Sequence, residues 1–174
     1  MAEDIDYCHP RGLDKAVFRH LLSGDWVDAR QNVLITGPTG VGKTYLACAL
    51  ANAACRQGHT AQYQRLPRLF EELTIARGDG RYPKLMAQIA KVDVLLLDDW
   101  GLAMLDDERR RDLLEILDER YQTRSTIITS QLPIATWHDS LGDPTLADAI
   151  LYRLVYHAHP LTLAANRCEN SNPN

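Results

Sequence analysis

Short apolar runs alternate with longer amphipathic segments along most of the chain. The run Val92–Leu97 is continuously apolar, as expected for a central strand that is buried on both faces of a sheet. The strands predicted in this way are Val33–Thr36, Ala61–Leu66, Val92–Leu97, Thr126–Ser130 and Pro160–Leu163. Because helical segments separate these strands, the pattern predicts an α/β fold with a parallel sheet and helices on both faces.

Apolar residues at helical spacing predict the helices between these strands. Asp106 precedes one of them and can cap its first turn, and Asp143 followed by Pro144 gives the same signal for another. The expected helices are a short one around Leu13–Leu22, then Tyr45–Arg56, Arg68–Arg77, Pro83–Ala90, Asp107–Tyr121 and Pro144–Val155. We expect Gly78, Asp79 and Gly80 to separate the third from the fourth.

The most informative chemistry lies between the first strand and the helix that follows it. The eight residues read G-x-x-x-x-G-K-T, and they are Gly37, Pro38, Thr39, Gly40, Val41, Gly42, Lys43 and Thr44. Glycines allow backbone N–H groups to close around phosphate oxygens, and the positive end of the following helix faces the anion. Chance alone would produce the pattern in roughly 0.5% of chains of this length. We therefore predict a site for a nucleoside triphosphate, with ATP and Mg²⁺ as its ligands.

Two residues of this loop have separate predicted roles. Lys43 is expected to reach the β- and γ-phosphates, and the Thr44 hydroxyl is expected to ligate Mg²⁺. Two acids, Asp98 and Asp99, follow the buried strand that ends at Leu97, at the edge where open α/β sheets bind ligands. Asp98 would contact Mg²⁺, and Asp99 would orient or deprotonate the attacking water. A plain turn that ends the strand is the alternative.

Polar side chains also end the strand Thr126–Ser130. If this strand neighbours the one that carries the acids, Ser130 or Gln131 could touch the γ-phosphate or the attacking water, and a hydroxyl that caps the strand end is the alternative. The sequence does not choose among Thr129, Ser130 and Gln131.

Two arginines are candidates for phosphate contacts. Arg153 lies on an amphipathic helix, where it is either a surface side chain or an arginine supplied to the nucleotide of a neighbouring subunit. Arg167 could reach a phosphate of its own chain.

Composition and charge narrow the classes of protein. The chain has 174 residues, a length typical of one domain, with 45% hydrophobic and 24% charged residues. A net charge of −4 excludes a globally basic nucleic-acid binder but leaves room for a local basic face. The sequence has neither an apolar stretch near the length of a membrane span nor a leader-like N-terminus, so we expect a cytoplasmic protein without membrane contacts.

Several ordered stretches together resemble the IstB-like ATPases, transposition helper proteins of bacterial insertion sequences. The resemblance extends from Asp4 to about Leu163. These proteins belong to the AAA+ group and are close relatives of the DnaC-type helicase loaders. The stretches that carry the resemblance are Asp4–Tyr7, Arg11–Asp14, Asn32–Thr44, Arg65–Leu73, Ala76–Gly80, Leu97–Leu102, Thr129–Pro133 with Trp137 and His138, and Gly142–Leu151.

The resemblance implies a P-loop NTPase with an AAA+ core, in which helices sandwich a parallel five-stranded sheet and the lid domain is reduced or absent. It implies an ATPase that assembles on DNA as a homo-oligomer and activates a cognate transposase. By position, Lys43 and Thr44 match the Walker A residues, Asp98 and Asp99 the Walker B acids, and Ser130 lies in the sensor strand.

The resemblance also assigns roles to five basic residues. Arg153 matches the arginine that helicase-loader relatives present to the adjacent subunit. The segment Arg68 to Lys84 corresponds to the helical insertion that approaches DNA, so the candidate phosphate contacts are Arg68, Arg77, Arg81 and Lys84. Because the acids Glu71, Glu72 and Asp79 are interleaved with them, a solvated face is the alternative.

Three departures from the family pattern shape the expected domain organisation. We expect one AAA+ domain over residues 1–174, with the P-loop core at about 30–165, the family's N-terminal helical domain missing and a disordered tail at 166–174. Tyr152 stands where relatives have an acid before the arginine. The glycine-serine-arginine pattern of the second sensor is also missing, and Arg167 is its approximate substitute.

Three rival functions stay open at this point. They are a helicase loader, a small-molecule phosphotransferase and a non-hydrolysing interaction module.

Overall fold

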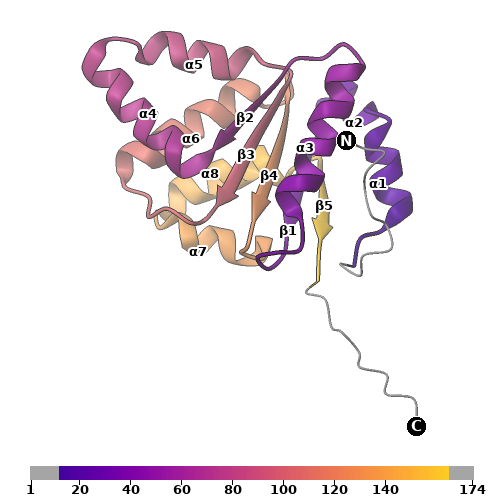
Figure 1. Cartoon of the computed structure of the whole chain (residues 1–174). Helices are drawn as coiled ribbons and strands as arrows, with labels where there is room; N and C mark the ends of the chain where they lie inside the picture. The colour runs from indigo at the N-terminus through magenta and orange to yellow at the C-terminus, as the bar shows by residue number, and fades with distance from the viewer. Residues whose placement is uncertain (1–11, 165–174) are drawn as a thin grey trace.

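Five parallel strands form one sheet in the order β2-β3-β4-β1-β5. The computed structural model describes residues 12–164 of the chain. The strands are β1 (Asn32–Thr36), β2 (Ala61–Arg65), β3 (Val94–Trp100), β4 (Ser125–Ser130) and β5 (Ala158–Thr162). All of them point the same way, so their carboxyl ends meet at one edge, at the bottom of Figure 1. The predicted fold class is confirmed.

Helices cover both faces of the sheet (Figure 1). The first face carries α1 (Lys15–Leu22), α2 (Asp25–Asp28) and α3 (Lys43–Arg56). The second face carries α4 (Leu66–Asp79), α5 (Tyr82–Lys91), α6 (Asp107–Arg120), the 3₁₀ turn η2 (Ile134–Thr136), α7 (Trp137–Leu141) and α8 (Pro144–Val155). Among the helices of residues 12–164, none is long and apolar enough to cross a membrane.

The alternation of side chains along the strands divides the core into two clusters. Val94 and Leu96 of β3 pack with α1, α2 and α3, whereas Leu95 and Leu97 pack with the helices of the second face. Ile127 and Ile128 of β4 divide in the same way. These pairs therefore show which face of the sheet each following residue of the same strand lies on, as long as the alternation continues.

A bulge near the end of β3 interrupts this alternation. The strand extends through both acids to Trp100, beyond its predicted end at Leu97, and its pairing with β4 shifts register between Leu97 and Trp100. Asp99 has a φ of 65°, in the left-handed region. Trp100 consequently joins the second-face cluster and lies against the Trp137 ring, with 5.0 Å between ring centroids. Bulges of this kind redirect side chains at the edges of sheets.

The structure differs from the sequence prediction in the α4 region and in three short elements. Gly78 and Asp79 belong to α4, and only Gly80, with a φ of 83°, and Arg81 separate α4 from α5. The helix tolerates Gly78 because a single glycine inside a helix lowers its stability by only about 1 kcal/mol relative to alanine. The elements α2, η2 and α7 were not predicted, since segments of three to five residues are too short for a helical period to register.

A buried arginine joins three elements at the amino-terminal edge of the sheet. Arg120 lies at the end of α6 with 2% of its surface exposed. Its guanidinium donates to the carbonyl oxygens of Ile89 at 3.0 Å and Val92 at 2.6 Å, and also to those of Asp93 and Ser125. Burial lowers the pKa of Arg120 to about 9, which still leaves the group protonated at neutral pH. The arginine thus donates to carbonyl oxygens at the end of α5, before β3 and at the start of β4.

We predict that Arg120→Met lowers the free energy of unfolding by about 3 kcal/mol, because several carbonyl oxygens lose a hydrogen bond from the guanidinium. Urea denaturation followed by circular dichroism measures this change. Arg111→Met is the matched control, since Arg111 is exposed on the same helix, and its effect should stay within about 0.5 kcal/mol. Equal effects of the two substitutions would contradict the role given to Arg120.

Candidate active site

The predicted phosphate loop connects β1 with α3 at the carboxyl edge of the sheet (Figure 1). Gly40 and Gly42 have φ values of 86° and 88°, a conformation that side chains disfavour. Gly37 is required for space, because a Cβ atom there would lie 2.7 Å from the carbonyl oxygen of Leu163. The loop therefore depends on glycine at these three positions.

The loop ends at the positive end of a long helix. Gly42 caps α3 and has no side chain of its own to bind the first N–H groups of the helix, where an anion is favoured. The Lys43 ammonium donates to the Pro38 carbonyl oxygen at 3.0 Å, across the loop. Burial lowers the pKa of Lys43, and the charges of Asp99 and Asp98 oppose that shift. These groups together form a site for an anion.

Asp98 is the most enclosed acid of the site, with 3% of its surface exposed. Its Oδ1 accepts a hydrogen bond from the Thr44 hydroxyl at 2.9 Å and a short one from the Thr129 hydroxyl. Its Oδ2 accepts from the Tyr63 hydroxyl at 2.6 Å. Donors from α3, β4 and β2 thus converge on one carboxylate beside the phosphate loop.

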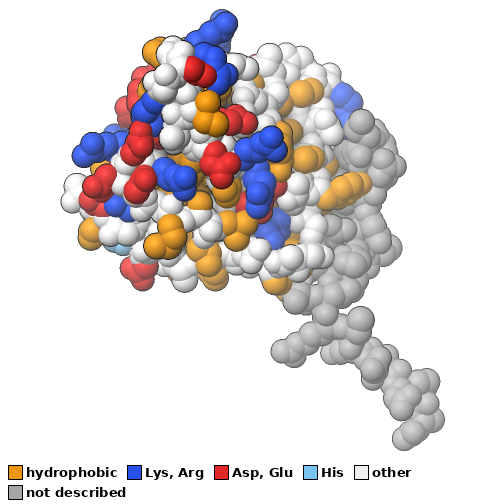
Figure 2. Space-filling view, turned by 60° about the vertical axis from the view of Figure 1, so that its left-hand side comes forward, with side chains coloured by type: hydrophobic (Ala, Val, Ile, Leu, Met, Phe, Trp, Pro, Cys, Tyr) orange, Lys and Arg blue, Asp and Glu red, His pale blue; other side chains and the backbone are white. Residues whose placement is uncertain are grey.

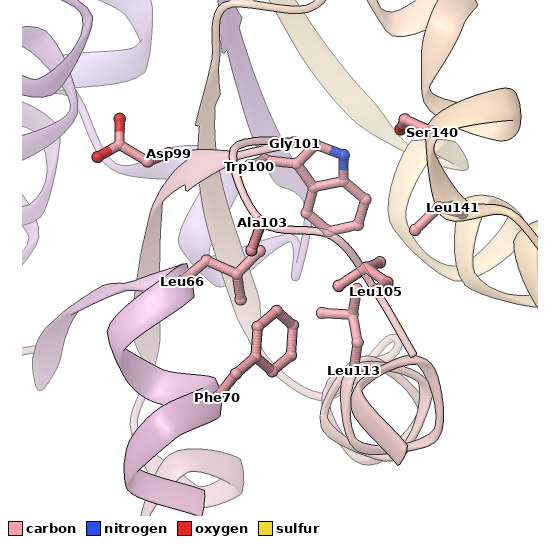
Figure 3. Close-up of a pocket in the computed structure, with 10 residues that line it drawn as sticks. All are labelled: Leu66, Phe70, Asp99, Trp100, Gly101, Ala103, Leu105, Leu113, Ser140 and Leu141. Atoms are coloured by element: carbon pink, nitrogen blue, oxygen red, sulfur yellow. The ribbon is translucent and has the colours of Figure 1, made fainter. Parts of the chain in front are cut away.

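Asp99 lies on the β3 bulge and points away from the core. Its carboxylate accepts from Arg65 Nε at 2.7 Å, and its backbone N–H donates to the Thr129 hydroxyl at 3.1 Å. Figure 3 shows the Asp99 carboxylate directed away from the apolar cluster into which the Trp100 ring points. The pocket in that cluster has only about 10 Å³ of space, no more than one water needs. The bulge therefore directs the Asp99 carboxylate away from the core, while the Trp100 ring packs into it.

Strand alternation decides which residue of β4 meets the acids. Thr129 contacts both Asp98 and Asp99, as described above. Ser130 lies on the opposite face, where its hydroxyl donates to the Trp100 carbonyl at 2.6 Å and accepts from the Leu132 N–H at 3.0 Å. Gln131 is exposed and lines a pocket of about 320 Å³ with Gly37 and Pro38. Of the three residues that the sequence left open, the structure brings Thr129 to the acids.

Arg153 lies far from the phosphate loop of its own chain. It is near the end of α8, shortly before Ala158 begins β5, and Ala158 pairs with Asn32 at the start of β1. The phosphate loop follows the other end of β1. Arg153 Nε donates to Asp118 Oδ1 at 2.7 Å, and 28% of the Arg153 side chain is exposed. Arg153 therefore lies toward the opposite edge of the sheet from the phosphate loop of its own chain.

The four predicted DNA contacts have different environments. Arg77 pairs with Glu108 at 2.7 Å and with the buried carboxylate of Asp112, so acids of α6 neutralise its charge. Arg81 pairs with Asp79 at 2.7 Å, and Arg68 lies 3.8 Å from Glu72. Lys84 is exposed on α5. Figure 2 shows basic and acidic side chains mixed on this side of the molecule, so there is no uniform basic face in this view.

The remaining predictions concern the chain ends. Arg167, predicted to reach a phosphate, and the expected tail at 166–174 lie outside the described residues. The same is true of the motif Asp4–Tyr7.

Sequence reasoning missed the contribution of β2. Tyr63 and Arg65, two residues apart and therefore on one face of the strand, each bind one of the paired acids. In the structure β2 pairs in register with β3, with Arg65 opposite Asp98. Only the strand order, which the sequence did not give, makes these residues neighbours of the acids.

The arrangement suits Mg²⁺ bound together with a phosphate ligand. Residues 12–164 contain no group of three or more His, Cys, Asp or Glu side chains that could hold a metal ion by itself. Mg²⁺ needs no such group, because it takes one or two protein oxygens and completes its shell with phosphates and waters. The Thr44 hydroxyl and the Asp98 carboxylate supply those oxygens beside the phosphate loop. The residues present therefore fit the predicted ligands.

Solved structures with a similar fold include the DnaC helicase loader and DnaI. The DnaC helicase loader superimposes with a TM-score of 0.72 at 24% identity, covering 85% of this chain and 86% of that one. DnaI gives a TM-score of 0.77 at 24% identity, covering 92% of this chain and 89% of that one. At these identities the similarity establishes the fold alone.

Sequence relatives are more informative. An insertion sequence ATP-binding protein of Sinorhizobium fredii is 57% identical over 93% of this chain, and one from Pseudomonas fluorescens is 58% identical over 77%. The insertion sequence IS21 ATP-binding protein of Pseudomonas aeruginosa is 35% identical over 92%. The chain covers 66%, 58% and 61% of the lengths of these three relatives.

A family model covers nearly the whole chain. The model described as IstB-like ATP binding protein matches residues 1–171, which include the phosphate loop, the paired acids and Arg153. The chain therefore belongs to the family of IstB-like ATP-binding proteins.

Proposed function

We propose that this chain hydrolyses ATP with Mg²⁺, assembles on DNA as a homo-oligomer and assists the transposase of an insertion sequence. The observation that carries the proposal is the convergence of Thr44, Thr129 and Asp98 beside an open phosphate loop. The names of the relatives support the link to insertion sequences, and they favour it over the helicase-loader alternative.

Each residue of the site has a part in the proposed reaction. The loop amides and Lys43 bind the β- and γ-phosphates, while Thr44 and Asp98 hold Mg²⁺. Bound Mg²⁺ would neutralise charge that develops on the transferred phosphoryl group. Asp99 orients the attacking water and takes its proton, for which it must exchange its pairing with Arg65 for that water. Thr129 keeps both acids in place, and Ser130 supports the adjoining loop.

The proposed site is completed by a second subunit. Arg153 cannot reach the phosphate loop of its own chain, and it pairs at the surface with Asp118, a residue that is itself largely exposed. Such a pair is weak, about 0–1 kcal/mol, so an anionic phosphate can displace the acid at little cost. We therefore propose that Arg153 stabilises the transition state in the adjacent subunit.

The proposed DNA contact is local. Arg68, Arg81 and Lys84 are exposed, and within the described part of the chain the two arginines pair with acids of their own segment. Arg77 serves instead as a link between α4 and α6 through Asp112. Phosphate contacts by the three exposed residues would position DNA without reading its sequence.

We predict that duplex DNA stimulates ATP turnover and that Lys43→Ala lowers turnover by about 100-fold or more, because a charged phosphate donor is lost. A coupled assay of phosphate release, with and without DNA, measures both effects. Lys91→Ala is the control, since Lys91 is an exposed lysine at the end of α5, away from the loop. Turnover that ignores DNA but rises with a small phosphate acceptor would refute the proposed function.

For Arg153 we expect Arg153→Ala to reduce ATP hydrolysis by about 1,000-fold and to leave nucleotide affinity unchanged. Mixing Arg153→Ala with Lys43→Ala should restore part of the activity, since the second variant offers Arg153 to an intact phosphate loop. Steady-state hydrolysis over a range of mixing ratios measures the recovery. If the single variant hydrolyses ATP normally, or if mixing restores nothing, the intersubunit role is wrong.

The DNA contacts predict two different outcomes for four substitutions. Arg68→Ala, Arg81→Ala and Lys84→Ala should each reduce the salt dependence of DNA binding by about one unit of slope, because each removes one phosphate contact. Arg77→Ala should instead lower the melting temperature, because the buried Asp112 carboxylate loses its positively charged partner. Fluorescence anisotropy at several salt concentrations measures the slopes. Unchanged slopes for all three variants would mean that these residues contact solvent and not DNA.

A further inference from the structure

Tyr63 is a half-exposed residue of the edge strand β2 whose hydroxyl binds the most enclosed acid of the site. We propose that Tyr63 is a positioning residue that fixes the orientation of the Asp98 carboxylate for Mg²⁺. The inference rests on the proposed function, because it concerns how the same site holds its metal.

Strand register places the tyrosine on the correct face. Tyr63 lies opposite Leu96, which packs on the α3 side of the sheet, and Asp98 follows Leu96 on that same side. The phenol therefore leans along the strand direction over the acid, and its hydroxyl meets Oδ2 at 2.6 Å. Because β2 is the edge strand of the sheet, 49% of Tyr63 is exposed. The ring therefore lies between Asp98 and the solvent.

The hydroxyl restrains a rotation that the other donors leave free. Thr44 and Thr129 both bind Oδ1 of Asp98, and among residues 12–164 only Tyr63 binds Oδ2. A carboxylate held by one oxygen can still turn about its Cβ–Cγ bond, since that torsion is broad. With both oxygens bound, Oδ1 stays directed at Thr44, the second oxygen ligand predicted for the metal.

The phenol acts as a permanent donor in this arrangement. A tyrosine hydroxyl keeps its proton at neutral pH, because a phenol loses it only at about pH 10, so Tyr63 donates to the Asp98 carboxylate. It therefore adds no negative charge to the site and does not compete for the cation. Hydrogen bonds to metal-binding carboxylates commonly tune metal affinity in this manner.

The chain contains a matched hydrogen bond away from the site. Tyr82 donates to the buried carboxylate of Asp112 at 2.7 Å, almost the same length as the bond from Tyr63 to Asp98. That pair lies between α5 and α6, beside Arg77 and apart from the phosphate loop. Removal of either hydroxyl should cost similar stability, but only one removal should affect the metal.

The test compares Tyr63→Phe with Tyr82→Phe in the binding of a fluorescent ADP analogue. Titration with Mg²⁺ gives the metal concentration at half-maximal enhancement of binding, and EDTA gives the affinity without metal. We expect Tyr63→Phe to raise the half-maximal Mg²⁺ concentration about 10-fold and to leave the affinity in EDTA unchanged. Tyr82→Phe should leave both quantities at their wild-type values.

The outcomes separate this inference from the proposed function. A wild-type half-maximal Mg²⁺ concentration in Tyr63→Phe would overturn the positioning role, and so would an equal shift in Tyr82→Phe or a failure of Tyr63→Phe to fold. If the wild-type protein binds no nucleotide, or binds it without any response to Mg²⁺, the proposed function itself fails. Thermal denaturation of both variants monitors folding.

Discussion

The hydrogen bonds that converge on Asp98 are the interaction on which the account depends. A buried carboxylate is costly unless donors surround it, and here the donors come from the helix that begins at the phosphate loop and from two neighbouring strands. The same bonds therefore fix the start of α3 relative to the sheet and keep two oxygen groups together for a cation. The same hydrogen bonds therefore serve both the stability of the fold and the binding of the cation. Loss of these partners of Asp98 would weaken both.

A second constraint is the bulge in β3. Without it, Asp98 and Asp99 would point to opposite faces, as successive strand residues do. The left-handed conformation of Asp99 lets Arg65 bind it from the α3 side of the sheet, and it releases Trp100 to pack against Trp137 (Figure 3). Backbone strain at one residue is thus linked to a large apolar contact beside it. The bulge also brings both acids within reach of one hydroxyl, that of Thr129.

Much of this could be predicted from the sequence, because the strongest signals are local. The glycines of the phosphate loop, the apolar run before Asp98 and the cap at Asp143 each act within a few residues, and the structure has the strand, loop and helix they indicate. The choice of Thr129 over Ser130 could not be predicted, since alternation gives two faces and the sequence does not say which one meets the acids. The contacts of Tyr63 and Arg65 with the acids depend on the order of the strands in the sheet. The pairing of Arg77 with Asp112 joins two helices that are distant in sequence, so it could not be predicted either.

The most direct test of the central claim is a crystal structure with Mg²⁺ and a non-hydrolysable ATP analogue. The account predicts the β- and γ-phosphates within the loop from Gly37 to Thr44, hydrogen-bonded by its amides and Lys43, and the metal next to Thr44 and Asp98. It also predicts that the hydroxyl of Tyr63 remains bonded to Asp98. A nucleotide bound elsewhere, or a metal remote from Asp98 with the loop amides turned away, would contradict the account.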